Sequence, residues 1–332
     1  MMKKPALALL IASLATPDAL ANDSTAELST GGLVFVRNDD VEMRAEDLFI
    51  STAEIRVRYR FFNKSDKDVT VHVAFPMPEV KVEHQDQNIS IPTEDPVNIL
   101  GFTTVVNGLP VNTQVEQKAM AGGVNRTGLL REYRIPLAPH LRSTNTALDR
   151  LPRAIRDELV KFGLAEIEEY DAGKGMQKHL SARWALSTTF YWQQTFPAQR
   201  ETVIEHRYKP SVGGTVRTVL GSSLARDEQA NARRKYCVDN DIIRTLERAR
   251  RKSDDVPPYA EERISYILKT GANWSGPIRD FRLVVDKRDP KALVSFCGEG
   301  VRKIAATQFE MRRKDFTPDG NLEVLILKPT RN

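Results

Sequence analysis

The sequence predicts a mainly β fold with α insertions, organised as two antiparallel β-sandwich-like domains. Apolar residues alternate with polar ones along many short segments, and clusters of Pro, Gly and Asn separate these segments. Helical spacing of apolar residues is confined to a few stretches. The length of 332 residues is that of about two domains.

The clearest alternation lies in residues 54–62, which therefore predict a half-buried strand. A second strand is predicted over 69–75, after the turn at 63–66, and we expect the two to form a hairpin with one solvated face. The first strand places two sets of residues on opposite faces: Ile55, Val57, Tyr59 and Phe61 on one, and Arg56, Arg58 and Arg60 on the other. Further strands are predicted over 33–37, 41–50, 97–106 and 111–118, the last two around the turn Asn107-Gly108.

Helical spacing predicts a helix over 148–162 that stops at Gly163, and a short helix over 164–170. Strands return at 184–196 and 201–208 in the same outline as the first pair, which suggests a duplicated module. Ser223 and Asp239 are predicted helix caps. The last third predicts strands over 262–269, 279–286, 292–297, 306–314 and 321–328, with Asp319-Gly320-Asn321 as a hairpin turn between the final two.

These elements predict four segments. Residues 1–21 are a signal peptide and residues 22–140 an N-terminal sandwich-like domain. Residues 141–180 form a helical linker or insertion, and residues 181–332 a second sandwich-like domain with a helical insertion at about 223–253.

The first residues are typical of a Sec-type leader: Lys3-Lys4, a short apolar run over 5–15, and a small-x-small sequence ending at Ala21. Cleavage after Ala21 would give a mature chain that starts at Asn22. The apolar run is too short to remain as a membrane anchor, so a periplasmic or secreted protein is expected. The alternative is a frayed N-terminal helix of a cytosolic protein.

Charge and cysteine content fit an exported protein. Loss of Lys3, Lys4 and Asp18 with the leader leaves 47 basic and 43 acidic residues, a small excess that does not predict a nucleic-acid partner. An oxidising compartment favours a disulfide between Cys237 and Cys297, which would close a loop of about 60 residues. Two separate buried thiols or one reactive thiol are the alternatives.

Known chemical motifs do not predict a catalytic, cofactor or metal site. The five histidines lack metal-ligand spacing, and Gly221-Ser222-Ser223 lacks the second glycine of a nucleophile elbow. His206 shares a face with Ile204 and Tyr208, which favours a hydrogen-bonded core or edge residue.

Two features are candidate interaction surfaces. The first is the row Arg56, Arg58 and Arg60, whose alternative role is cross-strand pairing with Glu42, Glu46 or neighbouring acids. The second is the loop that contains Trp274 and leads to Asp280. Trp274 could instead fill the end of a sandwich, with Gly276-Pro277 as a tight turn.

Several stretches resemble a bacterial family of exported proteins that contain domain of unknown function 4424. They are Asn22-Asp-Ser, Gly31-Gly-Leu-Val-Phe, Tyr59-Arg-Phe-Phe-Asn63 with Phe75-Pro-Met-Pro78, Tyr266-Ile-Leu-Lys-Thr-Gly271, Trp274-Ser-Gly-Pro-Ile and Asp280-Phe-Arg-Leu. The resemblance implies an envelope or periplasmic location and supplies no activity. Residues 53–120 also resemble the VIT domain, a β-rich interaction module, through Phe-x-Asn and Phe-Pro-x-Pro.

We therefore expect a non-catalytic binding protein without a cofactor, whose partner is an envelope protein or a cell-surface component. Two alternatives remain: a periplasmic hydrolase with dispersed catalytic residues, and a carrier of carbohydrate or another small ligand. The carrier would use Trp184, Trp192 or Trp274 as stacking platforms.

Overall fold

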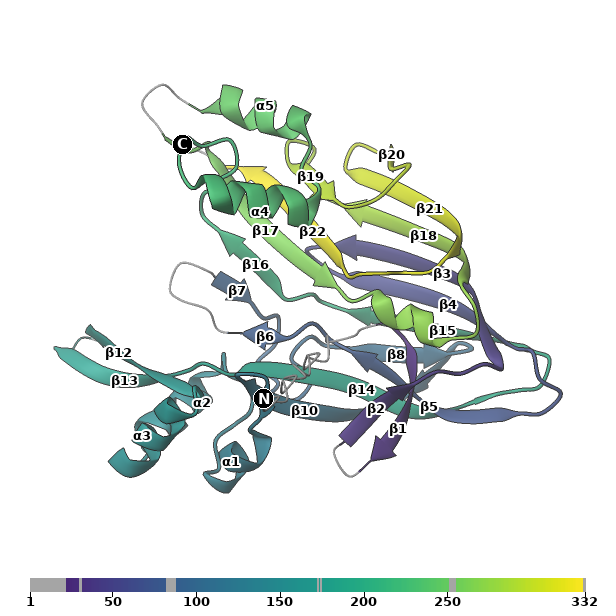
Figure 1. Ribbon diagram of the computed structural model, residues 1–332, viewed down its shortest axis with the longest axis horizontal. Coiled ribbons are helices and arrows are strands. Elements are labelled where there is room, and N and C mark those ends of the chain that lie inside the picture. The colour runs from purple at the N-terminus through teal and green to yellow at the C-terminus, as the bar shows by residue number, and fades with distance from the viewer. Residues whose placement is uncertain are drawn as a thin grey trace, which may run out of the picture.

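The computed structural model describes residues 22–330, except 30, 31, 82–87, 172, 174 and 251–254. The predicted leader, residues 1–21, lies outside the described residues. The described chain is mainly β with helical insertions, as the alternation predicts, and its long strands form three large sheets (Figure 1). None of its described helices is long and apolar enough to cross a bilayer.

An eight-stranded sheet packs its inner face against the other two large sheets. Its strands are antiparallel except for the parallel pair β18–β3. In spatial order they are β20 (Arg302–Lys303), β21 (Gln308–Phe316), β18 (Ile278–Asp286), β3 (Val41–Ser51), β4 (Ile55–Asn63), β15 (Glu201–Tyr208), β8 (Thr103–Val106) and β9 (Leu109–Val111).

The two covering sheets are antiparallel. The seven-stranded sheet contains β11 (Val124–Asn125), β10 (Gln114–Ala121), β14 (Ala185–Phe196), β5 (Val69–Pro76), β1 (Ser24–Ser29) and β2 (Gly32–Val36), with β6 (Val80–Lys81) paired to β14. The five-stranded sheet contains β19 (Leu293–Phe296), β22 (Leu322–Pro329), β17 (Tyr259–Tyr266), β16 (Val212–Thr215) and β7 (Asn88–Ser90).

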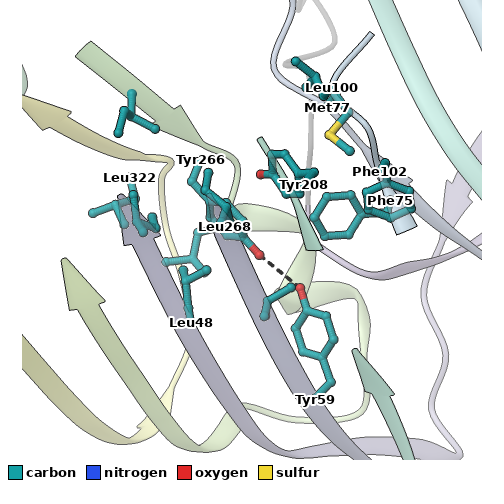
Figure 2. Packing of buried hydrophobic residues seen from close by; sticks show 14 of the residues in the cluster. Leu48, Tyr59, Phe75, Met77, Leu100, Phe102, Tyr208, Tyr266, Leu268 and Leu322 are labelled. Atoms are coloured by element: carbon teal, nitrogen blue, oxygen red, sulfur yellow. Dashed lines mark hydrogen bonds between the residues drawn. The ribbon is translucent and has the colours of Figure 1, made fainter. Parts of the chain in front are cut away.

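The main hydrophobic core lies between these three sheets. It takes Val57 and Phe61 from β4, Phe75 from β5 and Val324 from β22, all buried. Figure 2 shows Phe75, Phe102 and Tyr208 packed together beside Tyr59 and Tyr266. The period-two alternation of β4 thus directs its apolar side chains inward, as predicted.

Helices cover the outer parts of the sheets. The helices α1 (Thr127–Glu132), α2 (Arg142–Asp149) and α3 (Arg153–Lys161) bury a second cluster that contains Trp184. The helices α4 (Arg226–Tyr236) and α5 (Asn240–Ala249) pack on Leu325 and Leu327 of the five-stranded sheet. Asp239 caps α5 by accepting a hydrogen bond from the backbone N–H of Ile242 at 2.7 Å, as predicted.

The predicted hairpins at 54–75 and 184–208 are wrong, because each strand pair crosses between two sheets. Strand β4 pairs with β15, whereas β5 pairs with β14. The two crossing loops pack on each other: Asn63 Nδ2 donates to the Phe196 carbonyl at 2.9 Å, and the Ala198 N–H donates to Asp68 at 2.9 Å. The two segments have a similar sequence pattern because each contains two strands in different sheets, joined by loops that contact each other.

The final predicted hairpin is also wrong, since β21 belongs to the eight-stranded sheet and β22 to the five-stranded sheet. The sheets likewise combine strands from both halves of the chain, so the boundaries expected at 140 and 181 do not coincide with a division between sheets. By contrast, Asn107-Gly108 forms the expected turn, with positive φ at both residues, between the paired strands β8 and β9.

The helix predicted over 164–170 is a strand, β12 (Ala165–Asp171), paired with β13 (Met176–Ala182) in a two-stranded ribbon. In Figure 1 this ribbon extends beside α2 and α3. Glu166 and Glu168 favour a helix by propensity, but here they bond Arg183 at 2.8 and 2.6 Å. Cross-strand pairing thus overrides the local preference.

The structure joins Cys237 and Cys297 in a disulfide, as predicted, with 5.0 Å between their Cα atoms. The bond links the end of α4 to the segment after β19. It closes a loop whose ends are 60 residues apart, and in the chain-entropy model such a loop raises the free energy of unfolding by about 4 kcal/mol.

We expect the double variant Cys237→Ser/Cys297→Ser to lose about 4 kcal/mol of unfolding free energy, because the unfolded chain regains that loop entropy. Chemical denaturation with and without reductant measures it: the reduced wild-type protein serves as the control and should match the variant. An unchanged unfolding midpoint in the variant would contradict the role given to this bond.

Candidate functional site

The first described residues, Asn22 to Thr25, are buried in the interior of the protein although their side chains are polar. Asn22 and Asp23 precede β1, and Ser24 and Thr25 are its first two residues. The Asn22 carbonyl accepts a hydrogen bond from the Thr270 hydroxyl at 2.7 Å, and the Asn22 N–H donates to the same hydroxyl. Thr270 lies in the 3₁₀ helix η1 (Lys269–Asn273), which follows β17. This segment is therefore held by residues about 250 positions later in the sequence.

The Asn22 side chain is hydrogen-bonded on both sides. Its amide nitrogen donates to Glu46 Oε2 at 3.0 Å, and its amide oxygen accepts a hydrogen bond from the Tyr59 hydroxyl. The Tyr59 and Tyr266 hydroxyls are 3.1 Å apart and point toward each other (Figure 2). A polar network thus runs from Glu46 through Asn22 and Tyr59 to Tyr266, inside the hydrophobic core.

Asp23 and its neighbours fix the other side of the segment. Asp23 Oδ1 is 2.9 Å from His206 Nε2, and His206 Nδ1 is 3.0 Å from the Thr104 hydroxyl. The Trp274 indole N–H donates to the Asp23 carbonyl at 2.6 Å. His206 is the hydrogen-bonded core histidine that strand alternation favours.

Thr104, His206 and Asp23 have the order of hydroxyl, imidazole and carboxylate that nucleophilic catalysis uses. However, the side chains of His206 and Asp23 are 0% exposed and Thr104 is 3% exposed, so a substrate cannot reach the hydroxyl. In this structure the three residues hold the N-terminal segment in place.

A β-bulge in β3 turns Glu46 into the core. The register with β4 shifts between Met43 and Ala45, so that one extra residue is inserted. The shift puts Met43, Glu46 and Leu48 on the buried face together. Glu46 was expected as a partner for the arginine row. The bulge makes that expectation wrong.

Burial dominates the electrostatics of this cluster. It raises the pKa of Glu46 to about 8, although the Asn22 amide lowers it and the Asp23 charge raises it further. Burial also raises the pKa of Asp23 against the opposing effect of His206. One carboxylate oxygen on each residue, Glu46 Oε1 and Asp23 Oδ2, has no hydrogen-bond partner among the described residues. Both carboxyl groups are therefore costly in the charged form.

A second feature is an open groove of about 560 Å³ on the outer face of the eight-stranded sheet. Arg56 and Arg58 of β4 line it with Arg207 of β15 and Arg282 of β18. An adjoining groove of about 550 Å³ shares Phe49, Thr103 and Arg207 with the first. Together the two are lined by six basic and four acidic side chains: Arg56, Arg58, Arg207, Lys209, Arg282 and Arg288, and Asp47, Glu54, Glu205 and Asp286.

The arginine row is paired with acids of the same face, although not with Glu42 or Glu46. Arg58 lies 2.8 Å from Glu205, directly across the strand pair, and Arg60 lies 3.6 Å from Glu201. Glu54 is shared between Arg56 at 3.2 Å and Arg207 at 3.6 Å. Glu42 instead contacts Arg44 and Arg279.

The remaining predicted interaction residues are separate from the groove. Trp274 is completely buried and packs against Phe61 in a tilted arrangement, with 4.5 Å between ring centroids, so it fills the core and offers no surface. Asp280 lies opposite Lys314 and pairs with it at 3.1 Å. Trp184 and Trp192 are buried too, so none of the three tryptophans forms a stacking platform for a carbohydrate.

Sequence analysis did not identify the N-terminal cluster as a site. Asn22, Asp23, Tyr59, Tyr266, Thr270 and Trp274 lie in the stretches that carry the family resemblance, but no spacing rule connects them. Glu46 gave no signal, because a bulge cannot be read from alternation alone. Among the described residues, no group of three His, Cys, Asp or Glu side chains is placed to hold a metal ion.

Gly271 tests the packing of this cluster. A Cβ atom at Gly271 would lie 2.6 Å from Asn22 Nδ2 and 3.2 Å from Ile278, so we expect Gly271→Ala to displace Asn22. The free energy of unfolding should fall by about 1–3 kcal/mol, the range for overpacked cores. Gly320→Ala is the matched control, because no heavy atom lies within 4 Å of the place that its new methyl group would take. Equal stabilities of the two variants in denaturant titration would refute the close contact.

Comparison with known proteins shows the family but gives no activity. No curated protein matches the chain. A solved structure with partial likeness is a "putative nutrient binding protein" from Legionella pneumophila subsp. pneumophila str. Philadelphia 1, at 14% identity and a TM-score of 0.43. The match covers 93% of this chain and 70% of that one, and at this TM-score it carries no argument. The resemblance of residues 53–120 to a VIT domain stays a prediction. A family model described as a domain of unknown function, DUF4424, matches residues 21–325, and the chain belongs to that family.

Proposed function

We propose that this protein is exported with loss of residues 1–21 and acts in the periplasm or at the cell surface as a non-catalytic binding protein. The leader pattern ending at Ala21 and the Cys237–Cys297 disulfide support export, because disulfides persist in oxidising compartments. The partner we propose is an acidic segment of another envelope protein, bound in the groove on the eight-stranded sheet.

The observation that carries the proposal is the convergence of basic side chains from β4, β15 and β18 on one open groove. Among the described residues, Lys209 and Arg288 at its end have no acidic side chain within 4.0 Å, although Arg288 still lowers the pKa of Asp286, and Glu54 pairs with two arginines. The basic side chains that line the groove therefore outnumber the acidic ones, and its net charge is positive. Its walls include Phe49, over which Arg56 lies at 4.4 Å. Basic side chains beside an aromatic side chain in the groove lining suit an acidic segment that also carries apolar residues.

The existing ion pairs do not prevent this role. Exposed pairs contribute about 0–1 kcal/mol each, so a partner's carboxylate can replace Glu205 on Arg58 at little cost. The side chains of Arg58 and Glu205 are 56% and 49% exposed, which leaves both accessible.

Export is tested by the N-terminus of the native protein. We expect the protein isolated from the bacterial envelope fraction to begin at Asn22, as measured by N-terminal sequencing and intact mass. A variant with Ala21→Arg should retain its leader, because a large charged side chain does not suit the small-residue cleavage site. Recovery of the full-length wild-type chain in the cytosol would refute export.

Binding is tested with a synthetic peptide of alternating Glu and Leu residues. We expect Arg58→Glu to bind this peptide roughly five- to tenfold more weakly than wild type, which corresponds to about 1–1.4 kcal/mol. Arg153→Glu is the matched control: it makes the same charge change on α3, where the Arg153 side chain is 95% exposed. Binding should also weaken as salt rises. Equal affinity of the two variants in isothermal titration calorimetry would exclude the groove.

A further inference from the structure

The charge on the backbone nitrogen of Asn22 depends on whether residues 1–21 are attached. Asn22 is fully buried, and its backbone nitrogen lies against Thr270 in the cluster that contains Glu46 and Asp23. If residues 1–21 remain attached, this nitrogen is an amide with one hydrogen. If they are removed, it becomes the α-amino group of the chain, an ammonium with three hydrogens and a positive charge near neutral pH.

The surroundings contain acceptors for that charge. Glu46 Oε1 and Asp23 Oδ2 have no hydrogen-bond partner among the described residues, and both residues are at least 99% buried. Asn22 contacts Glu46 through its side-chain amide and precedes Asp23 directly. The other titratable groups that face Glu46 are Tyr59 of β4 and Tyr266 of β17, and burial raises the pKa of both, which keeps them neutral. His206 of β15 is hydrogen-bonded to Asp23 Oδ1, the carboxylate oxygen other than the unpaired Oδ2. Lys and Arg side chains are not among the groups that influence Glu46.

We propose that cleavage after Ala21 creates at Asn22 an α-ammonium group that forms a buried ion pair with Glu46 and Asp23, so that leader removal completes the core. The inference rests on the proposed export. In the cleavage, a leader peptidase adds one water molecule across the Ala21–Asn22 amide bond. The C–N bond breaks, the hydroxyl goes to the Ala21 carbonyl carbon, and the hydrogen goes to the Asn22 nitrogen. The new carboxylic acid then releases a proton and the new amine takes one up.

The existing hydrogen bonds hold the ammonium in a defined place. Tyr59, Glu46 and the Leu268 carbonyl fix the Asn22 side chain, and the Thr270 hydroxyl fixes its backbone. Thr270 accepts one hydrogen of the ammonium, which leaves two for the unpaired carboxylate oxygens. A buried carboxylate is destabilising when alone and much less so when it is paired and hydrogen-bonded.

The test compares two purified chains, one beginning at Asn22 and one at Ala21, each released from a fusion partner by a protease that cuts directly before that residue. We expect the chain that begins at Ala21 to unfold several degrees lower, because its positive charge sits one residue away from the carboxylates. The melting temperatures of both chains are measured at pH 7.

Substitution of Glu46 distinguishes charge from simple crowding. In a Glu46→Gln background, the difference between the two chains should become clearly smaller, since one of the two carboxylates that accept the charge is gone. Glu42→Gln is the matched control: Glu42 is buried on the same strand but is already paired with Arg44 and Arg279, so the difference should persist. Equal melting temperatures of the two wild-type chains, or a difference that Glu46→Gln leaves intact, would overturn the proposal.

The pH dependence has a defined sign. Without a nearby cation the pKa of Glu46 is raised from 4.5 to about 8, so the folded state binds more protons than the unfolded state between these values. The chain that begins at Ala21 should therefore lose stability as pH rises from 4.5 to 8. The chain that begins at Asn22 should lose less, and the gap between the two should widen over this range. A constant gap would contradict the ion pair.

Chemical labelling gives an answer even if a variant does not fold. In the native wild-type chain that begins at Asn22, we expect the α-amine to react with acetic anhydride at least about tenfold more slowly than exposed lysines, and at a normal rate after denaturation. Labelling at the rate of an exposed amine would refute its burial. Because these chains are made without the export machinery, the result is independent of where the native protein is found and of whether the groove binds an acidic peptide.

Discussion

The structure depends on the hydrogen bonds that hold a buried polar segment, residues 22–25, of whose buried side-chain atoms only Asp23 Oδ2 lacks a partner among the described residues. Thr270, Tyr59, His206 and Trp274 supply those partners, from η1, β4, β15 and the loop before β18. Each partner is itself packed in the main core. The segment therefore connects the eight-stranded sheet to both of its covering sheets, and a change at any partner removes a bond from the centre of the protein.

The sequence predicted the strands well and their pairing poorly. Alternation in 54–62 identifies which face of β4 is buried, because that depends only on neighbouring residues. It does not reveal whether the next strand lies beside β4 or in the opposite sheet, since both arrangements bury the same face. The loop that follows Asn63 is compatible with either arrangement. In the structure it lies against the loop after Phe196, because the Asn63 side chain donates a hydrogen bond to the carbonyl of Phe196, 133 residues later.

One of the two candidate sites could be predicted from the sequence and the other could not. Arg56 and Arg58 could be found from the sequence because a period of two places them together on an exposed face. The cluster around Asn22 could not, because it brings together segments that lie far apart in the sequence and depends on a bulge at Arg44 that turns Glu46 into the core. The shared family stretches contained most of its residues, yet only the three-dimensional arrangement gives them a common role.

The distance in sequence between Asn22 and Thr270, 248 positions, has a consequence for folding. Chains dominated by long-range pairing fold slowly, because the entropy of loop closure is lost before the stabilising long-range contacts form. Residues 22 and 23, which precede β1, can form their bonds to Thr270 and Trp274 only after the last quarter of the chain is present. While the chain is being synthesised, residues 22 and 23 therefore lack these partners, and the core around them stays incomplete until the segment 269–274 is present, a stage at which exposed apolar surface favours aggregation.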